Sequence, residues 1–222
     1  MLKTLLLSTL LLTGFATRAA TPADSLQTVL HSPDFAEITT ADAVMIDQRY
    51  ATTNNFMGRD LYGPFNRVFL HRLAYDKLKA AIALLKQEHP TYHFILFDAL
   101  RPRSVQYLLW NKVAGTPQEP YVADPKKGSV HNYGFAVDLS VVDDKGRELD
   151  MGTPYDTFSP LAEPQLEAAK LAAGELTAAQ IANRMVLRKP MEAAGFKVLP
   201  NEWWHFDALP ADIVRRRFTI VE

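Results

Sequence analysis

The sequence lacks cysteine altogether among its 222 residues. This absence excludes disulfide bonds, a thiol nucleophile, a cysteine zinc site and an anchor through a lipid-modified cysteine. An excess of charge of one sign is also missing, because 24 Lys and Arg residues nearly balance 25 Asp and Glu residues. The sequence shows no internal repeat and no low-complexity segment. Together these absences predict a globular protein with no nucleic-acid partner and no charged tail.

Long hydrophobic runs are missing too, since the apolar stretch over 5–16 is too short to span a bilayer as a mature helix. It follows Lys3 and precedes the small residues Ala19 and Ala20, an order typical of a secretory signal peptide. We therefore expect residues 1–20 to be a signal peptide, and the mature protein to be exported to the periplasm without a stable membrane anchor. A core helix that happens to be N-terminal is the alternative.

Residues 21–222 are expected to form a single domain, which is large enough to bury its own core. Apolar periodicity and the positions of Gly and Pro predict helices over 67–88, 104–113, 165–173 and 177–194. Alternating and β-branched stretches predict strands over 44–50, 92–97, 135–142, 196–199 and 203–207. Residues 21–40 are expected to be an irregular lead-in, and 52–65, 114–130 and 147–163 to be loops or irregular segments. This order of elements predicts the α+β class.

Two clusters of polar residues carry the candidate chemistry. In the first, His131 ends a loop and Asp138 lies seven residues later on a predicted strand, with Gly134 between them to allow a turn. Both side chains can then face one point. In the second, Glu202 and His205 flank a pair of tryptophans. These two residues do not share a face of an extended strand, so a bend beside the tryptophans is needed to bring them to one site.

Two histidines and one aspartate match the three protein ligands of a catalytic zinc site, which leaves the fourth position to water. Zinc-bound water ionises near neutral pH, and a carboxylate that is not a ligand must then move its proton. Glu202 is the candidate for that role. Taken singly, each ligand has a plainer interpretation: His131 as a surface histidine, Asp138 as the cap of a turn, and His205 as a core histidine with one hydrogen bond.

Arg101 is a further candidate, because it follows the predicted strand over 92–97 and strand ends often carry site residues. A cation at that position can hold a developing oxyanion or a carboxylate. The alternative is a surface arginine that precedes a helix. Asp98, at the end of the same strand, is a candidate partner that pairs with Arg101 or orients it.

Taken together, these segments resemble the D-alanyl-D-alanine dipeptidases, the zinc peptidase family that includes the vancomycin-resistance dipeptidases. The family pattern Ser-x-His-x-x-Gly-x-Ala-x-Asp is present over 129–138, and Glu-x-x-His with its Trp pair is present over 202–205. The resemblance runs over about 50–206. One departure is Ala99-Leu100, where the family often has Gly-Tyr before the Arg-Pro pair. It bears on how substrate is held more than on the zinc chemistry.

The resemblance implies that His131, Asp138 and His205 bind one Zn²⁺ ion per chain. It implies that Glu202 is the general base and then the general acid, and that Arg101 stabilises the tetrahedral intermediate. The implied fold is the small α+β zinc peptidase fold shared with D,D-carboxypeptidases and hedgehog signalling domains, with a central antiparallel sheet and flanking helices.

The implied reaction is hydrolysis of the dipeptide D-Ala-D-Ala to two D-alanines, with Ser129 and Asp98 in the substrate-binding part of the site. An exported enzyme of this kind would act in the turnover of dipeptide derived from peptidoglycan, whereas vancomycin resistance would need the cytoplasmic precursor pool. Two alternatives stay open: a D,D- or L,D-carboxypeptidase on longer wall peptides, and a zinc-bearing binding module without catalysis. The long segments over 114–130 and 147–163 favour a lid, and hence the closed pocket of a dipeptidase.

Overall fold

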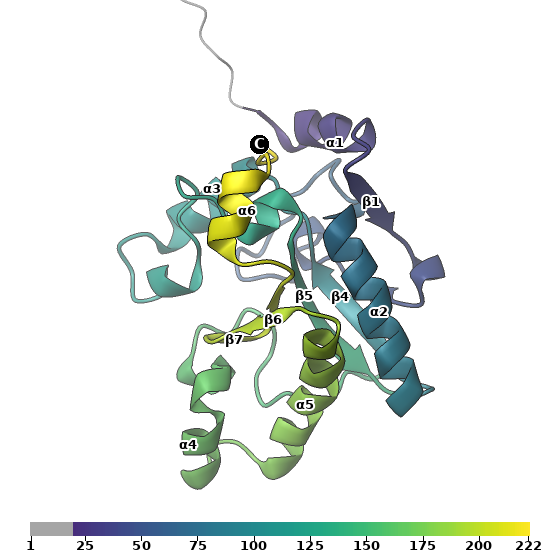
Figure 1. Ribbon diagram of the computed structural model, residues 1–222. Helices are drawn as coiled ribbons and strands as arrows, with labels where there is room; N and C mark the ends of the chain where they lie inside the picture. The colour runs from purple at the N-terminus through teal and green to yellow at the C-terminus, as the bar shows by residue number, and fades with distance from the viewer. Residues whose placement is uncertain (1–19) are drawn as a thin grey trace, which may run out of the picture.

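The computed structural model of the protein describes residues 20–222 (Figure 1). The predicted signal peptide, residues 1–20, lies outside this part of the chain except for Ala20. In chain order, the helices are α1 (Pro22–Leu30), α2 (Arg72–Glu88), α3 (Arg103–Val113), α4 (Glu167–Ala172), α5 (Ala178–Ala193) and α6 (Ala211–Arg217). The strands are β1 (Phe35–Ile38), β2 (Met45–Ile46), β3 (Val68–His71), β4 (His93–Asp98), β5 (Ala136–Val142), β6 (Lys197–Leu199) and β7 (Glu202–Asp207). This mixture of helices and strands confirms the α+β class.

Five strands form the larger sheet, in the order β2-β4-β5-β7-β6, while β1 and β3 form a separate antiparallel pair. Within the larger sheet β4, β5, β7 and β6 are antiparallel neighbours, and β2 runs parallel to β4. All seven residues of the central strand β5 are buried. Because a charged side chain inside such a strand is costly unless it is paired, Asp138 is the residue of β5 that points to a function.

Two helices, α2 and α5, pack against each other and against the larger sheet. Figure 1 shows α2 running beside β4 and β5. The buried residues of α2 recur with helical spacing along one face; they are Ala74, Leu78, Ala81, Ile82 and Leu85. α5 begins with a capping box made by Thr177 and Gln180 and continues through Pro190, which lies inside the helix.

Two predictions for the N-terminal part of the domain are wrong. Residues 21–40 are not irregular, because α1 begins with a capping box between Thr21 and Asp24 and is followed by β1. The start of the helix predicted over 67–88 is instead β3, which pairs with β1 in antiparallel register. Pairing with β1, which is distant in sequence, here overrides the local apolar periodicity. That periodicity carries no information about strand pairing.

The strand predicted over 44–50 is also shorter than expected. It covers Met45–Ile46, because the chain turns into a 3₁₀ helix at Arg49–Ala51. The predicted loops over 52–65, 114–130 and 147–163 carry no helix longer than a 3₁₀ turn. They meet around the site described below.

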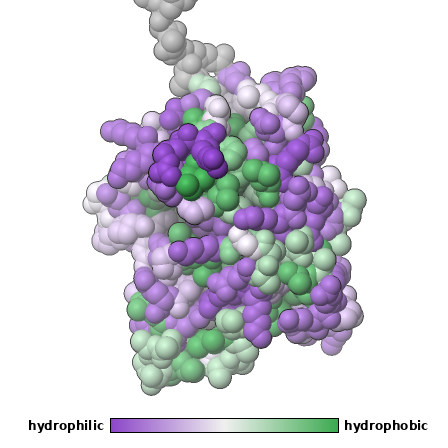
Figure 2. Space-filling view, in the orientation of Figure 1, coloured by the Kyte–Doolittle hydropathy of each residue, from purple (hydrophilic) through white to green (hydrophobic). Residues whose placement is uncertain are grey.

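The surface of the domain mixes polar and apolar residues. On the face shown in Figure 2, hydrophobic residues are interspersed with hydrophilic ones. The large hydrophobic side chains that are exposed come from several elements; they are Leu30, Met45, Ile46, Leu73, Tyr107, Leu108 and Leu171. Over residues 20–222, every helix is too short or too polar to cross a membrane.

Candidate metal centre and active site

Strand register brings together three of the predicted site residues. Asp98 of β4 pairs with Asp138 of β5, and Asp138 pairs with His205 of β7. Directly paired residues on neighbouring strands point to the same face of a sheet, so these three side chains share one face. His131 reaches them from the 3₁₀ turn Val130–Tyr133, which immediately precedes β5.

Gly134 closes that 3₁₀ turn in the left-handed conformation, with a φ of 71°. A Cβ atom at this position would lie 2.8 Å from the backbone nitrogen of His71, closer than a side chain tolerates. That nitrogen donates a hydrogen bond of 2.9 Å to the Gly134 carbonyl. Only glycine combines the left-handed φ with so close an approach, and the tight turn carries His131 back over the start of β5.

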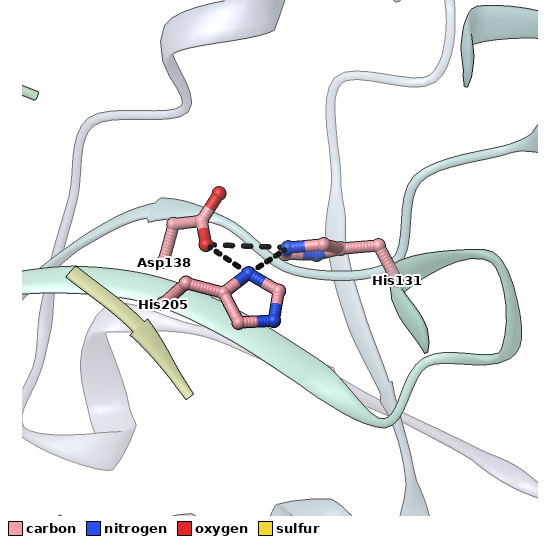
Figure 3. A group of neighbouring side chains, drawn as sticks. All are labelled: His131, Asp138 and His205. Atoms are coloured by element: carbon pink, nitrogen blue, oxygen red, sulfur yellow. Dashed lines mark hydrogen bonds and ion pairs between the residues drawn. The ribbon is translucent and has the colours of Figure 1, made fainter. Parts of the chain in front are cut away.

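The three predicted metal ligands meet at one point (Figure 3). Asp138 Oδ1 lies 3.2 Å from His131 Nε2 and 3.0 Å from His205 Nδ1, and the two nitrogens are 3.1 Å apart. All three side chains are buried. Four-coordinate zinc with ligand atoms at about 2.0 Å separates those atoms by about 3.3 Å. The spacing therefore fits a small divalent cation.

Hydrogen bonds on the far side of each imidazole fix which nitrogen carries the proton. His131 Nδ1 lies 2.6 Å from the carbonyl oxygen of Ala99, which can only accept, so Nδ1 is the donor. His205 Nε2 donates in the same way to a carboxylate oxygen of Asp207 at 2.9 Å. In the neutral rings, the nitrogens that face Asp138 therefore carry no hydrogen. Three acceptors this close repel one another unless a cation lies between them, and such outer hydrogen bonds are typical of metal-bound histidines.

The surroundings of His205 also favour a positive charge. Burial by itself lowers the pKa of this imidazole, but the nearby carboxylates of Asp207 and Asp138 outweigh burial and hold its pKa well above the usual range. The cluster is therefore built to hold a positive charge, from a proton or from a divalent cation.

Glu202 reaches the same point through an irregularity in β7. Val198 of β6 pairs with Phe206, whereas the next residue, Leu199, pairs with Glu202, so β7 bulges between the two pairs. The bulge is the bend that the sequence required, and it lets Glu202 Oε2 lie 3.8 Å from His205 Nδ1. Burial raises the pKa of Glu202 to about 7, a suitable value for a general base at neutral pH.

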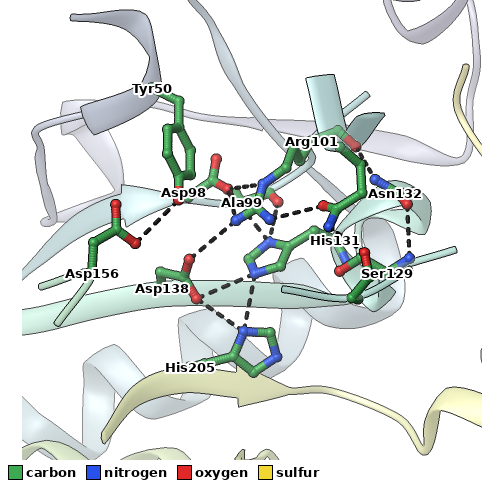
Figure 4. A network of polar contacts seen from close by, with 12 residues as sticks. Tyr50, Asp98, Ala99, Arg101, Ser129, His131, Asn132, Asp138, Asp156 and His205 are labelled. Carbon is green, nitrogen blue, oxygen red and sulfur yellow. Dashed lines mark hydrogen bonds and ion pairs between the residues drawn. The ribbon is translucent and has the colours of Figure 1, made fainter. Parts of the chain in front are cut away.

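Arg101 lies beside the ligand cluster, with Nη2 3.5 Å from Asp138 Oδ2 (Figure 4). Its Nε donates to Asp98 Oδ2 at 2.8 Å, and its Nη1 donates to Gln106 Oε1 at 2.9 Å. The guanidinium also lies over the ring of Tyr50. Burial opposes the charge, but Asp98 and the other groups around it hold the pKa of Arg101 well above its usual range. Arg101 is therefore a fixed positive charge in the cavity wall.

Asp98 lies behind Arg101 and does not line the cavity. It is fully buried, pairs with Arg101 Nη2 at 2.7 Å and accepts a hydrogen bond of 2.5 Å from the Tyr62 hydroxyl. Because these bonds occupy the carboxylate, its placement matches the alternative in which Asp98 orients Arg101.

Ser129 and Trp204 do line the cavity, whereas Leu100 does not. Ser129 Oγ accepts the N–H of His131 at 3.4 Å, which leaves the hydroxyl hydrogen available to a ligand. Leu100, which stands where the family often has Tyr, is buried in an apolar cluster with Val105. The side chain at that position therefore contributes to packing in this protein.

Among the residues of the site that the sequence analysis does not single out are Tyr50, Tyr155 and Asp156. Asp156 lines the cavity with a left-handed φ of 60°, a conformation that costs energy for a residue with a side chain. The Tyr50 hydroxyl donates to Asp156 Oδ1 at 3.1 Å, whereas Oδ2 is buried without a hydrogen-bond partner (Figure 4). Burial, and then the charge of Asp138, raise the pKa of Asp156 well above its usual range.

The sequence signal for these three residues was indirect. Tyr50 begins, and Tyr155 and Asp156 closely follow, stretches that contribute to the family resemblance over 50–56 and 150–153. Composition and periodicity say nothing about them, because Tyr155 and Asp156 lie in an irregular segment.

The site opens into a cavity of about 460 Å³, with open solvent at its mouth included. Three aromatic side chains, one from each predicted loop, form a cover in its wall. Phe158 stacks on Tyr121 with ring centroids 5.4 Å apart and meets Phe56 edge to face at 5.0 Å. The Tyr121 hydroxyl donates to Glu163 at 3.0 Å. We call Phe56, Tyr121 and Phe158 the aromatic cover.

Comparison with known proteins shows the family of the chain. The family model Peptidase_M15, described as D-ala-D-ala dipeptidase, matches residues 31–222. A D-alanyl-D-alanine dipeptidase of Escherichia coli is 31% identical over 162 residues, which cover 73% of this chain and 77% of that protein. Proteins of the same name from Enterococcus faecium and Enterococcus faecalis are 30% and 28% identical, each over 72% of this chain and 83% of the relative. The chain belongs to the Peptidase_M15 family, and it is a peptidase.

Proposed function

We propose that the protein is an exported zinc dipeptidase that hydrolyses D-Ala-D-Ala to two D-alanines. The relatives reported above carry the name of this activity. The observation that carries the proposal is the unpaired oxygen of Asp156, which belongs to the same cavity as the ligand cluster and Glu202. A dipeptide has a free ammonium group, and that group supplies the charged donor that this oxygen lacks.

Zinc is the proposed cation, because two imidazole nitrogens and one carboxylate oxygen form the ligand set of many catalytic zinc sites. The residues that would hold it are His131, Asp138 and His205, whose facing atoms are bare acceptors at suitable distances. When bound, the ion supplies a water that ionises near neutral pH and a Lewis acid for the carbonyl.

The remaining roles fall to residues that touch the same space. Glu202 takes a proton from the attacking water and delivers it to the leaving amine. Arg101 donates to the carbonyl oxygen as negative charge develops there, with Asp98 and Gln106 holding its guanidinium. Ser129 donates its free hydroxyl hydrogen to the carboxylate of the substrate.

A dipeptide fits this cavity better than a longer wall peptide. A carboxypeptidase substrate continues beyond the residue that precedes the scissile bond, and it has no ammonium group at that position. In the proposed binding mode that position faces the carboxylate of Asp156, and the aromatic cover lines the same cavity. A neutral amide against Asp156 would leave the carboxylate without a charged partner, which favours the free dipeptide.

A binding module without catalysis would need neither Glu202 nor Arg101. Both residues are buried beside the ligand cluster. Arg101 is paired with Asp98 at 2.7 Å, whereas the ion pair of Glu202 with His205 is 3.8 Å long, and a buried carboxylate so loosely paired is costly without a function. Their placement supports an enzyme over a structural zinc site.

Export to the periplasm and a role in the turnover of peptidoglycan-derived dipeptide are part of the proposal. Both rest on the signal-peptide pattern of residues 1–20. We also propose that the sheet and its site represent the fold shared with D,D-carboxypeptidases and hedgehog signalling domains. Because D,D-carboxypeptidases would then have the same fold, a carboxypeptidase is the strongest alternative activity.

The test is release of D-alanine from D-Ala-D-Ala by the mature, zinc-loaded protein, with L-Ala-L-Ala as the blank and the Glu202→Gln variant as the control. We expect release from D-Ala-D-Ala that is lost in the variant. Release from D-Ala-terminated tripeptides and pentapeptides, without release from the dipeptide, would replace the proposal with a carboxypeptidase. If the zinc-bound protein released no D-alanine from any of these substrates, the result would favour a binding module without catalysis.

A further inference from the structure

Asp138 differs from the other proposed ligands because it offers two oxygens, and each has its own neighbours. Oδ1 faces the two histidines. Oδ2 lies 3.0 Å from the Tyr155 hydroxyl and 3.5 Å from Arg101 Nη2. A carboxylate oxygen accepts and a phenol has one hydrogen to give, so Tyr155 donates to Oδ2.

The Tyr155 ring has little freedom to turn away from this bond. The residue is 8% exposed. Its ring centroid lies 4.9 Å from that of Phe97, 5.4 Å from that of Trp204 and 6.4 Å from that of Tyr50. Packing on three aromatic neighbours holds the Tyr155 hydroxyl on Asp138 Oδ2. A fixed outer hydrogen bond of this kind orients the carboxylate of a metal ligand.

The number of Asp138 oxygens that reach the cation matters for the site. A carboxylate binds a cation through one oxygen or through both. Binding through both would take up a coordination position that a catalytic zinc site leaves to water. It would also turn Oδ2 away from Arg101, whose guanidinium is balanced between Asp98 and Asp138.

We propose that Tyr155 is a positioning residue, whose hydroxyl keeps Asp138 a ligand through Oδ1 alone and shares the charge of Oδ2 with Arg101. The inference rests on the proposed zinc site and deepens the proposed function. Arg101 would then keep a donor for the substrate, and one coordination position of a bound ion would stay available to water.

The backbone at Asp156 explains how one turn serves two purposes. In an extended segment, consecutive side chains point to opposite sides. The left-handed φ of Asp156 turns the chain between Tyr155 and Asp156, so that one residue reaches Asp138 while the next lines the cavity. Backbone strain is often retained at functional sites for such a reason. Tyr155, which holds the proposed ligand Asp138, and Asp156, the proposed acceptor of the ammonium group, are thus neighbours in the sequence.

The test is the Tyr155→Phe variant, which removes one oxygen and keeps the ring. We expect its zinc affinity, measured by competition with a chelator, to fall by about tenfold to 100-fold. The visible spectrum of the Co²⁺-substituted protein should lose intensity, because Asp138 can then bind through both oxygens and raise the coordination number. The kcat for D-Ala-D-Ala should fall while KM stays within about twofold, since the substrate-binding groups are intact.

The matched control is Tyr75→Phe, which also removes a tyrosine–carboxylate bond, to Asp42 at 2.5 Å. Neither Tyr75 nor Asp42 lines the cavity, so zinc affinity and the Co²⁺ spectrum should match those of the wild type. A Tyr155→Phe protein that behaves like this control in both metal measurements would overturn the inference.

The metal measurements need no substrate, so the two proposals fail separately. A wild type that binds zinc without releasing D-alanine would overturn the dipeptidase function. The metal measurements would still test the positioning role of Tyr155. A wild type that binds no divalent cation would overturn both.

Discussion

Replacing Asp156 by Asn should weaken catalysis and stabilise the fold at the same time. The substitution keeps the shape of the side chain and an oxygen that can accept from the Tyr50 hydroxyl. Asn also tolerates the left-handed backbone at this position as readily as Asp does. What changes is the charge of a buried carboxylate that has one unpaired oxygen.

The catalytic loss follows from the charged hydrogen bond to the substrate ammonium. Hydrogen bonds to charged groups contribute about 1.5–3 kcal/mol. With about 1.36 kcal/mol for each factor of ten, kcat/KM for D-Ala-D-Ala should fall by about 10-fold to 150-fold. The effect should appear mainly in KM, because the ammonium is bound in the ground state as well as in the transition state.

The gain in stability should depend on pH. Burial raises the pKa of Asp156 in the folded protein, so the wild type loses stability as the pH rises above the pKa of about 3.9 in the unfolded chain. Asn has no such titration. In metal-free protein, the difference in the free energy of unfolding between Asp156→Asn and the wild type should therefore be small near pH 4 and favour the variant increasingly toward pH 7.

The assays are steady-state kinetics on D-Ala-D-Ala and on its N-acetyl derivative, together with urea unfolding at several pH values. The matched control is Asp144→Asn, which removes an exposed carboxylate from a turn outside the cavity and should change neither measurement appreciably. The wild type should prefer the free amine, and Asp156→Asn should lose most of that preference. Equal cleavage of both substrates by the wild type would refute the assignment of Asp156 to the ammonium group.

Three further perturbations test other parts of the site. Glu202→Gln should lower kcat by about 10²-fold to 10⁴-fold while zinc affinity stays unchanged; a parallel loss of zinc would make Glu202 a ligand. Asp207→Ala removes the outer hydrogen bond of His205 and should weaken zinc binding by about tenfold to 100-fold, measured by chelator competition. Arg184→Met removes a buried guanidinium that pairs with Glu167 and donates to the carbonyls of Met151 and Leu161. Because Arg188 still pairs with Glu167, the free energy of unfolding should fall by about 1–3 kcal/mol in urea titrations, from the unpaired carbonyls; an unchanged midpoint would contradict that estimate.

Much of the site was predictable because its residues lie in short local patterns. His131 and Asp138 are separated by one turn and the start of one strand, and Glu202 and His205 lie within a single strand. Gly134 marked the turn that joins the first pair, since its left-handed φ and close contact admit no other residue. Long elements with clear periodicity, such as α2 and α5, were predictable for the same reason, because their pattern repeats over several turns.

The sequence alone thus singled out the side chains that are proposed to bind the metal, since ligand type and local spacing are properties of short segments. Only the tertiary structure decided that β1 pairs with β3, that Asp98 supports Arg101 from behind, and that Tyr155 and Asp156 belong to the site. These facts depend on contacts between segments far apart in the chain, and on an irregular turn whose strain is stabilised by packing around it. Local propensity carries no information about such contacts, because their energy exists only after the chain has folded.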